Sequence, residues 1–377
     1  MLQLLLGGSG SGKTMLLYQR IRARAEKGEK SILLVPEQFT SSTEGRIYRE
    51  LGDALSGMVE SFSFTSLAEK ILSTEGGAAV QTLSDAGRAV LVRRALEELQ
   101  DNVHYYHRHR RSAAFCQMAA QTIDELKSAG LSGQQLAQLA GACGAESGKL
   151  SELALIFQGY ETLLARSGMD PSDRLELAGA RLEEALARHS LPEFLRDRAV
   201  FIDEFDTFNA PKKRLLGAML AALPSVTVAL CDDGAPLLPG DLSLFSGAKQ
   251  VAAQLRQLAR KNGAEVAVPQ LLRKDLRHRN APGLAAVAEL LETGSCTADA
   301  PAGEVRLFAA PSREEEARAA AGAIRRLMRQ GVRCGKIAVV CRDIAKYRAA
   351  VRYEFRMAEI PLYCDEPTTP EFSAPAT

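Results

Sequence analysis

The stretch Gly7-Gly8-Ser9-Gly10-Ser11-Gly12-Lys13-Thr14 (GGSGSGKT) decides the fold of this chain. It satisfies the pattern GxxxxGK[ST], and it stands between an apolar run at 2–6 and a segment of helical periodicity that ends at Gly28. Glycines let successive backbone N–H groups turn inward around a phosphate, and the N-terminus of the following helix adds a favourable dipole. The sequence therefore predicts a strand, a phosphate-binding loop and a helix, with a glycine-rich turn that matches by chance as the alternative.

Two carboxylates follow a second apolar run and complete the expected site. Ala199–Ile202 leads directly to Asp203 and Glu204, so both acids are predicted at the carboxyl end of a buried strand, where ligands bind in open α/β sheets. In a phosphate-binding loop Lys13 reaches the β and γ phosphates and the Thr14 hydroxyl binds Mg²⁺. Asp203 is predicted to hold Mg²⁺ through water, and Glu204 to orient or deprotonate the attacking water.

The remaining apolar runs indicate a parallel sheet. Segments 31–36, 199–203 and 225–231 are continuous apolar runs, and a helix is predicted around 212–223. We expect an α/β fold with the parallel sheet of a P-loop NTPase of the RecA-like kind.

A change of periodicity suggests how the chain is divided. From about Leu83 to His189 apolar residues recur at helical spacing, which predicts an all-helical insertion in the α/β domain. The expected boundaries are 1–82 for the first part of the α/β domain, 83–192 for the insertion and 193–292 for the rest of the α/β domain. A linker then occupies 293–303, and an incomplete second RecA-like domain occupies 304–377. Strands are predicted there at 304–308, 336–341 and 360–364, with a helix that begins at Ser312.

Composition excludes several classes of protein. The chain has 377 residues, a formal charge of +1, 46% hydrophobic and 25% charged residues, which is typical of folded globular proteins rather than disordered ones. Its seven cysteines form no CxxC pair, so neither a disulfide framework nor a zinc site is indicated. No apolar run is long enough to span a membrane, and we expect a cytoplasmic protein.

Two basic segments are weaker candidates for contacts with phosphate. HYYHRHRR at 104–111 interleaves bases with aromatic residues, which suits a nucleic-acid strand, but a solvated surface is the more frequent explanation of such a run. RKDLRHR at 273–279 has the same two interpretations.

With these residues placed, the sequence resembles the UvrD-like superfamily 1 helicases, and within them the AddB family of bacterial helicase-nuclease subunits. The resemblance lies in GGSGSGKT close to the first Met, ILLVPEQFT at 32–40, VESFSFTSLAEKIL at 59–72 and IDEFDTFNAPKKRLL at 202–216. Segment 312–366 resembles the beginning of the second motor domain of these helicases.

The resemblance implies a set of functional residues and partners. The phosphate loop corresponds to Gly7–Thr14, the magnesium-site acid to Asp203 and the hydrolytic carboxylate to Glu204, while Arg342 occupies the place of an arginine that approaches the γ-phosphate. AddB proteins pair with the motor protein AddA and process DNA ends during double-strand break repair. Their C-terminal part carries a nuclease domain and an iron–sulfur cluster, and no cysteine of this chain is assigned to such a cluster.

The leading expectation is a helicase-like part of an AddB-type subunit that binds ATP and Mg²⁺ and acts with an AddA-type subunit on DNA ends and single strands. Two alternatives stay open. One is a self-sufficient P-loop ATPase or kinase unrelated to DNA. The other is a non-catalytic scaffold that binds DNA or docks another subunit.

Overall fold

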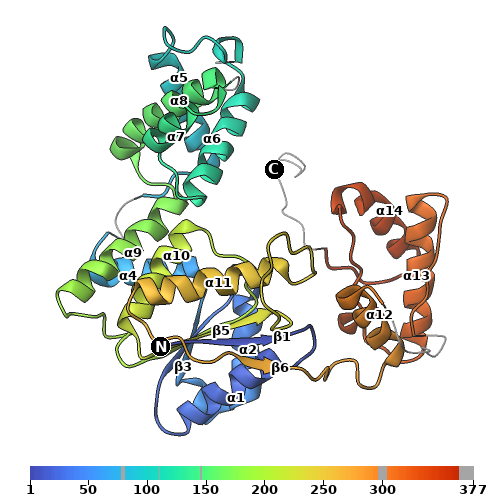
Figure 1. Ribbon diagram of the computed structural model, residues 1–377. Coiled ribbons are helices and arrows are strands. Elements are labelled where there is room, and N and C mark those ends of the chain that lie inside the picture. Colours follow the sequence, from blue (N-terminus) through green and yellow to red (C-terminus); the bar gives the residue numbers. More distant parts are fainter. Residues whose placement is uncertain (78–80, 110, 145–146, 296–303, 365–377) are drawn as a thin grey trace, which may run out of the picture. The chain divides into compact units, whose positions relative to one another are not determined.

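The computed structural model describes residues 1–77, 81–109, 111–144, 147–295 and 304–364 (Figure 1). The chain divides into two compact units, Met1–Ala300 and Pro301–Thr377. Most of the predicted linker, and the tail from residue 365 onward, lie outside the described residues.

The first unit is built on one six-stranded parallel sheet with the strand order β3-β2-β4-β5-β1-β6. The strands are β1 (Leu2–Gly7), β2 (Ser31–Leu34), β3 (Val59–Phe62), β4 (Ala199–Ile202), β5 (Ser225–Cys231) and β6 (Gln270–Leu272). This confirms the predicted α/β class and the four strands expected at 2–6, 31–36, 199–203 and 225–231. The edge strands β3 and β6 are additional to the sequence prediction.

Helices cover both faces of the sheet, as Figure 1 shows. The face that carries Leu4, Ile32 and Val200 packs against the helices α4 (Phe64–Glu75), α9 (Pro171–Ala187), α10 (Ala210–Ala222) and α11 (Ser246–Lys261). The other face, with Leu5 and Leu33, packs against α1 (Lys13–Ala25), α2 (Thr40–Leu51) and the short α3 (Asp53–Ser56). Burial on both faces explains why the central strands are continuous apolar runs rather than alternating ones.

A separate helical cluster, the α5–α8 block, has its own core. It consists of α5 (Asp85–Glu98), α6 (Ala113–Ser128), α7 (Gly133–Ala140) and α8 (Ser147–Ser167), packed around fully buried Phe157 and Ile156. The chain enters and leaves the block side by side, because Thr82 and Met169 form a parallel bridge. The helices expected from the periodicity between 83 and 189 are therefore present, although α9 packs with the sheet rather than in the block.

A buried polar network ties the block to α9. The Lys127 ammonium lies 2.8 Å from carboxylate oxygens of both Asp170 and Asp173, and the Tyr160 hydroxyl donates to Asp170 at 2.6 Å. Asp170 is 1% exposed, so these charges compensate each other in a setting where an unpaired one would be costly.

The described part of the second unit contains two main helices, α13 (Arg313–Arg329) and α14 (Ile344–Met357). Ile324 of α13 packs with Phe355 of α14 and with Ile360. As expected, Ser312 caps α13 by accepting a hydrogen bond from the Glu315 amide at 3.3 Å.

The prediction of strands in this unit was wrong for the described residues. Segments 304–308, 336–341 and 360–364 have no strand pairing there, and Leu307 and Val340 are almost fully exposed. The physical reason is that a strand needs a neighbour to satisfy its backbone groups, and apolar content alone does not supply one.

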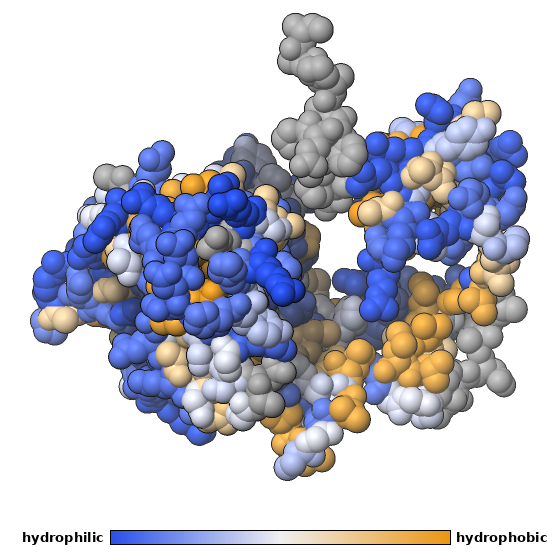
Figure 2. Space-filling model, turned by 90° about the horizontal axis from the view of Figure 1, so that it is seen from above, coloured by the Kyte–Doolittle hydropathy of each residue, from blue (hydrophilic) through white to orange (hydrophobic). Residues whose placement is uncertain are grey.

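The surface is mostly hydrophilic, with smaller hydrophobic patches, in the view of Figure 2. Some apolar side chains remain outside the cores; α12 (Pro282–Thr293) leaves Leu290 and Leu291 largely exposed. Among the described residues, no helix is both long enough and apolar enough to cross a membrane.

Candidate functional site

The loop between β1 and α1 is a tight turn that only glycine can form at two positions. Gly10 and Gly12 have φ of 78° and 89°, in the left-handed region that other residues avoid. Space is also restricted, because a Cβ atom on Gly10 would lie 2.7 Å from the Cβ of Arg277. The loop therefore brings its backbone close to a neighbouring segment without side chains in between.

Lys13, the first residue of α1, turns back over the loop. Its ammonium donates hydrogen bonds to the carbonyl oxygens of Gly7 at 2.7 Å and Gly8 at 2.8 Å. Burial lowers the pKa of Lys13, and the nearby Cys231 and Asp203 oppose that effect. The ammonium is thus held at the mouth of the loop by two carbonyl groups, which the oxygens of an anionic ligand can replace.

Ser11 leaves a polar atom without a partner inside the loop. Its hydroxyl is buried and forms no hydrogen bond within the described part of the chain. A buried polar group without a partner costs free energy, so this atom is suited to a ligand that enters the loop. The loop thus fits a phosphate group by its backbone conformation, its lysine and this hydroxyl.

The carboxyl end of β4 brings Asp203 to the start of α1. Asp203 is 6% exposed, and one of its carboxylate oxygens accepts the Glu204 amide at 3.1 Å. Burial raises the pKa of Asp203, although the neighbouring Thr14 side chain, the Glu204 amide and the Lys13 charge oppose the shift. The hydroxyl and carboxylate that the sequence assigned to Mg²⁺ are therefore adjacent, and both are oxygen ligands of the kind that Mg²⁺ prefers.

Glu204 has an unusual backbone for its residue type. Its φ is 64°, in the left-handed region, and its side chain is exposed rather than packed. Burial of part of the group and the neighbouring Asp203 charge both raise the pKa of Glu204. Strained conformations of this kind cost about 1–3 kcal/mol and cluster at functional sites.

A cation from α2 also faces the two acids, and no sequence pattern indicated it. The Arg46 guanidinium lies 5.0 Å from the ring centroid of Tyr18, and its charge acts on both Asp203 and Glu204. Burial raises the pKa of Tyr18 to about 12, so this phenol stays neutral beneath the guanidinium.

The basic segment 273–279 lies against the β1–α1 loop. The Leu276 amide donates to the Gly10 carbonyl at 3.0 Å, and the Arg277 guanidinium lies 3.4 Å from the Ser9 hydroxyl. Asp275 holds the turn by accepting hydrogen bonds from the backbone of Arg277 and from His278. The structure thus places this predicted segment beside the loop, while a contact with phosphate stays a prediction.

A cavity of about 380 Å³ adjoins the loop. Its walls come from Ser9 and Ser11 of the loop, Asp232 after β5, Lys274, and Glu292 near the end of α12. The walls are mixed in charge, and the cavity opens on the same edge of the sheet as Asp203.

The other predicted residues lie elsewhere. Arg342 belongs to the second unit, where it is exposed in a bend before α14, and its approach to a γ-phosphate stays a prediction. In segment 104–111, of which Arg110 lies outside the described residues, Glu152 accepts hydrogen bonds from the amides of His104 and Tyr105 at 2.9 and 2.8 Å. Part of that segment is therefore structural, and its contact with nucleic acid is untested.

No group of three or more His, Cys, Asp or Glu side chains that could hold a metal ion occurs among the described residues.

Comparison with known proteins identifies the family. A sequence profile described as "ADDB, N-terminal" matches residues 4–288. The chain is 34% identical over 378 residues to the B-type subunit of the ATP-dependent helicase/deoxyribonuclease of Desulforudis audaxviator, with 97% of this chain and 32% of that relative covered. The protein of the same name from Symbiobacterium thermophilum is 32% identical over 393 residues, with 98% and 32% covered. The chain thus spans about a third of the length of these curated relatives, and it belongs to the AddB family of helicase/deoxyribonuclease subunits.

Proposed function

We propose that the chain binds ATP with Mg²⁺ at the β1–α1 loop, in a P-loop domain of the RecA-like kind into which the α5–α8 block is inserted. The observation that carries the proposal is the geometry of the loop, in which the Lys13 ammonium turns back onto the Gly7 and Gly8 carbonyls while Asp203, at the carboxyl end of β4, lies close enough to act on Lys13 electrostatically. The left-handed glycines and the unpartnered Ser11 hydroxyl support the same site.

Each residue has a distinct part in this proposal. The Lys13 ammonium exchanges its two carbonyl partners for oxygens of the β and γ phosphates, and amides of the loop donate to the same phosphates. Thr14 and Asp203 hold Mg²⁺, which neutralises charge on the phosphates. Glu204 orients the water that attacks the γ-phosphate, and its raised pKa makes it a stronger proton acceptor once ionised.

We infer a wider role from the relatives. They are named as the B-type subunit of an ATP-dependent helicase/deoxyribonuclease, and the chain covers about a third of their length. We propose that this part supplies the helicase-like, ATP-binding portion of an AddB-type subunit, which works with an AddA-type subunit on DNA ends and single strands in double-strand break repair.

Binding of a fluorescent ATP analogue with Mg²⁺ tests the nucleotide site. Lys13→Ala is expected to weaken binding by tenfold or more, because a charge-assisted contact with the phosphates is lost. Lys261→Ala, which removes an exposed lysine at the end of α11, is the control and should bind as the unaltered chain does. Equal binding by the Lys13→Ala and control variants would refute the proposed site.

Coexpression with the AddA-type subunit tests the wider role. The chain is expected to copurify with that subunit, and Lys13→Ala is expected to leave copurification intact while weakening nucleotide binding by tenfold or more. Robust ATP turnover by the chain without DNA or partner would favour a self-sufficient ATPase instead. DNA or partner binding in a chain that binds no ATP would favour a scaffold.

A further inference from the structure

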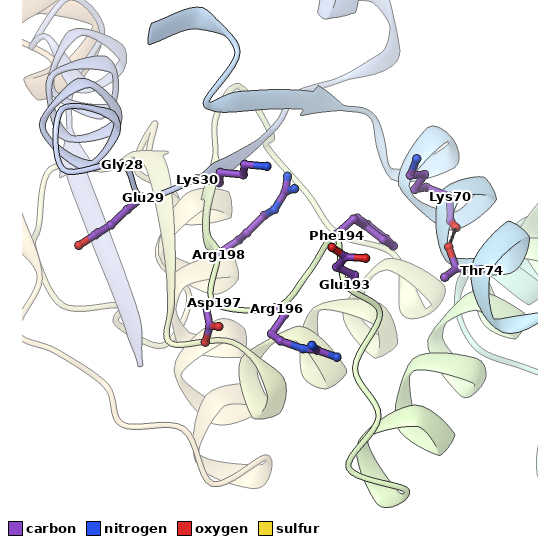
Figure 3. Close-up of a pocket in the computed structure, with 10 residues that line it drawn as sticks. All are labelled: Gly28, Glu29, Lys30, Lys70, Thr74, Glu193, Phe194, Arg196, Asp197 and Arg198. Carbon is purple, nitrogen blue, oxygen red and sulfur yellow. Dashed lines mark hydrogen bonds between the residues drawn. The ribbon is translucent and has the colours of Figure 1, made fainter.

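A second pocket lies at the opposite edge of the sheet from the candidate nucleotide site. It encloses about 570 Å³ near the points where β2 and β4 begin, whereas Asp203 stands where β4 ends (Figure 3). Its lining comes from three places that are far apart in the sequence: the end of α1 and the turn after it, α4, and the loop before β4. The residues are Gly28, Glu29, Lys30, Lys70, Thr74, Glu193, Phe194, Arg196, Asp197 and Arg198.

Two of the charges in this pocket are already compensated. Glu29 forms an ion pair with Arg24 at 2.9 Å, and its side chain points away from the pocket in Figure 3. Arg198 is 8% exposed, and its guanidinium forms an ion pair with Glu60 of the edge strand β3. A buried, anchored arginine of this kind is held in place before any ligand arrives.

Three further cations have no carboxylate partner among the described residues. Lys30 extends into the pocket beside Arg198, and the Lys70 ammonium lies 5.9 Å from the ring centroid of Phe194. Arg196 donates only to the Leu191 carbonyl, at 3.3 Å. Asp197 points away from the middle of the pocket in Figure 3, which leaves Glu193 as the acid that opposes these cations.

We propose that this pocket binds the phosphate group of a nucleotide or of a nucleic-acid strand. Lys30 lies beside the anchored Arg198 guanidinium, and Lys70 and Arg196 add positive charge on other parts of the lining (Figure 3). A phosphate offers more charge and more acceptor oxygens than a carboxylate, so it gains more from a pocket with several cations in its lining. The volume is within the range of small-molecule sites and exceeds what inorganic phosphate needs, which favours a ligand of nucleotide size.

The test is carried out on the full chain with Lys13→Ala already present, so that phosphate binding at the β1–α1 loop is weakened equally in every sample. The probes are ADP and a single-stranded oligothymidylate of ten nucleotides. The binding of each probe is measured at two salt concentrations. The pocket variant carries Lys30→Glu and Lys70→Glu. The matched control carries Arg260→Glu and Lys261→Glu, the same change of charge at exposed positions on α11.

The pocket variant is expected to bind at least one probe tenfold or more weakly than its parent, while the control keeps the parent's affinity. Loss for ADP identifies a free nucleotide as the ligand, and loss for the oligothymidylate alone identifies a strand. Affinities that are equal in the pocket variant and the control would overturn the proposal. So would a glutamate-rich peptide that competes better than either probe, because the pocket would then be a docking site for an acidic protein segment. The test is independent of the proposed ATP site, because that site carries the same Lys13→Ala change in every sample and cannot produce a difference between the pocket variant and its control.

Discussion

At the scale of single residues, Gly10 and Gly28 share a left-handed backbone but have different surroundings. Their φ values are 78° and 75°, yet a Cβ on Gly10 would lie 2.7 Å from the Cβ of Arg277, whereas a Cβ on Gly28 would have nothing within 4 Å. Gly28→Ala is expected to cost about 1–2 kcal/mol from the backbone alone. Gly10→Ala should cost roughly 1–3 kcal/mol more, because the loop and segment 273–279 must separate.

Urea unfolding of the two glycine variants measures this difference. Equal losses of unfolding free energy would show that segment 273–279 does not pack on the loop as described.

Asp203 gives a pH-dependent prediction. Because burial raises the pKa of Asp203, the folded chain binds this proton more readily than the unfolded chain does. At a pH above the pKa of Asp203 in the folded chain, the buried charge lowers the free energy of unfolding. This loss disappears as the pH falls toward the ordinary pKa of an aspartate. Asp203→Asn is expected to raise the unfolding free energy by roughly 0.5–2 kcal/mol at pH 7.

The free energy of unfolding of Asp203→Asn and of the parent is measured at pH 7 and at about pH 4, because the stabilisation by the substitution should be smaller at the lower pH. A variant that is less stable than the parent at pH 7 would contradict a destabilising charge on Asp203.

At the scale of elements, the sequence pattern predicted the central strands and several helices, but it did not predict the two edge strands of the sheet. β5 matches the predicted segment at both ends, because a continuous apolar run between turns reports burial on both faces. The edge strands were missed because β3 and β6 are three or four residues long and only partly buried.

The same limit explains the error in the second unit, where apolar runs at 304–308 and 336–341 lack strand partners in the described residues. For the candidate site, the local pattern predicted the positions of Lys13 at the start of a helix and Asp203 at the end of a strand, while their roles stay predictions. The approach of Arg46 and Leu276 depends on how distant segments pack, which a local pattern does not contain.

The junction between the α5–α8 block and α9 depends on one lysine. Lys127 compensates both Asp170 and Asp173, and its side chain is only 9% exposed. Lys127→Met removes the cation that compensates Asp170 and Asp173 and leaves Asp170 with only the Tyr160 hydroxyl, so we expect a loss of about 3–5 kcal/mol in unfolding free energy.

The matched control is Lys261→Met, which changes an exposed lysine at the end of α11. This variant is expected to lose less than about 0.5 kcal/mol of unfolding free energy. Comparable losses in both variants would mean that the network contributes little.

At the scale of the whole molecule, catalytic rate is expected to depend on more than the first unit. Phosphoryl transfer relies on cations that close over the γ-phosphate, and an arginine of this kind contributes about 10³ to 10⁵ in rate. We therefore predict that the chain alone binds ATP but hydrolyses it slowly. A steady-state ATPase assay with single-stranded DNA checks this, and strong stimulated turnover would contradict it.

Backbone hydrogen exchange with and without ATP and Mg²⁺ tests the proposed nucleotide site. We predict slower exchange in the amides of 8–14 and around Asp203 when the nucleotide is present, and a smaller change in the Lys13→Ala chain. Unchanged exchange in those two segments, or protection confined to the pocket around Lys30 and Arg198, would contradict the assignment of the nucleotide site.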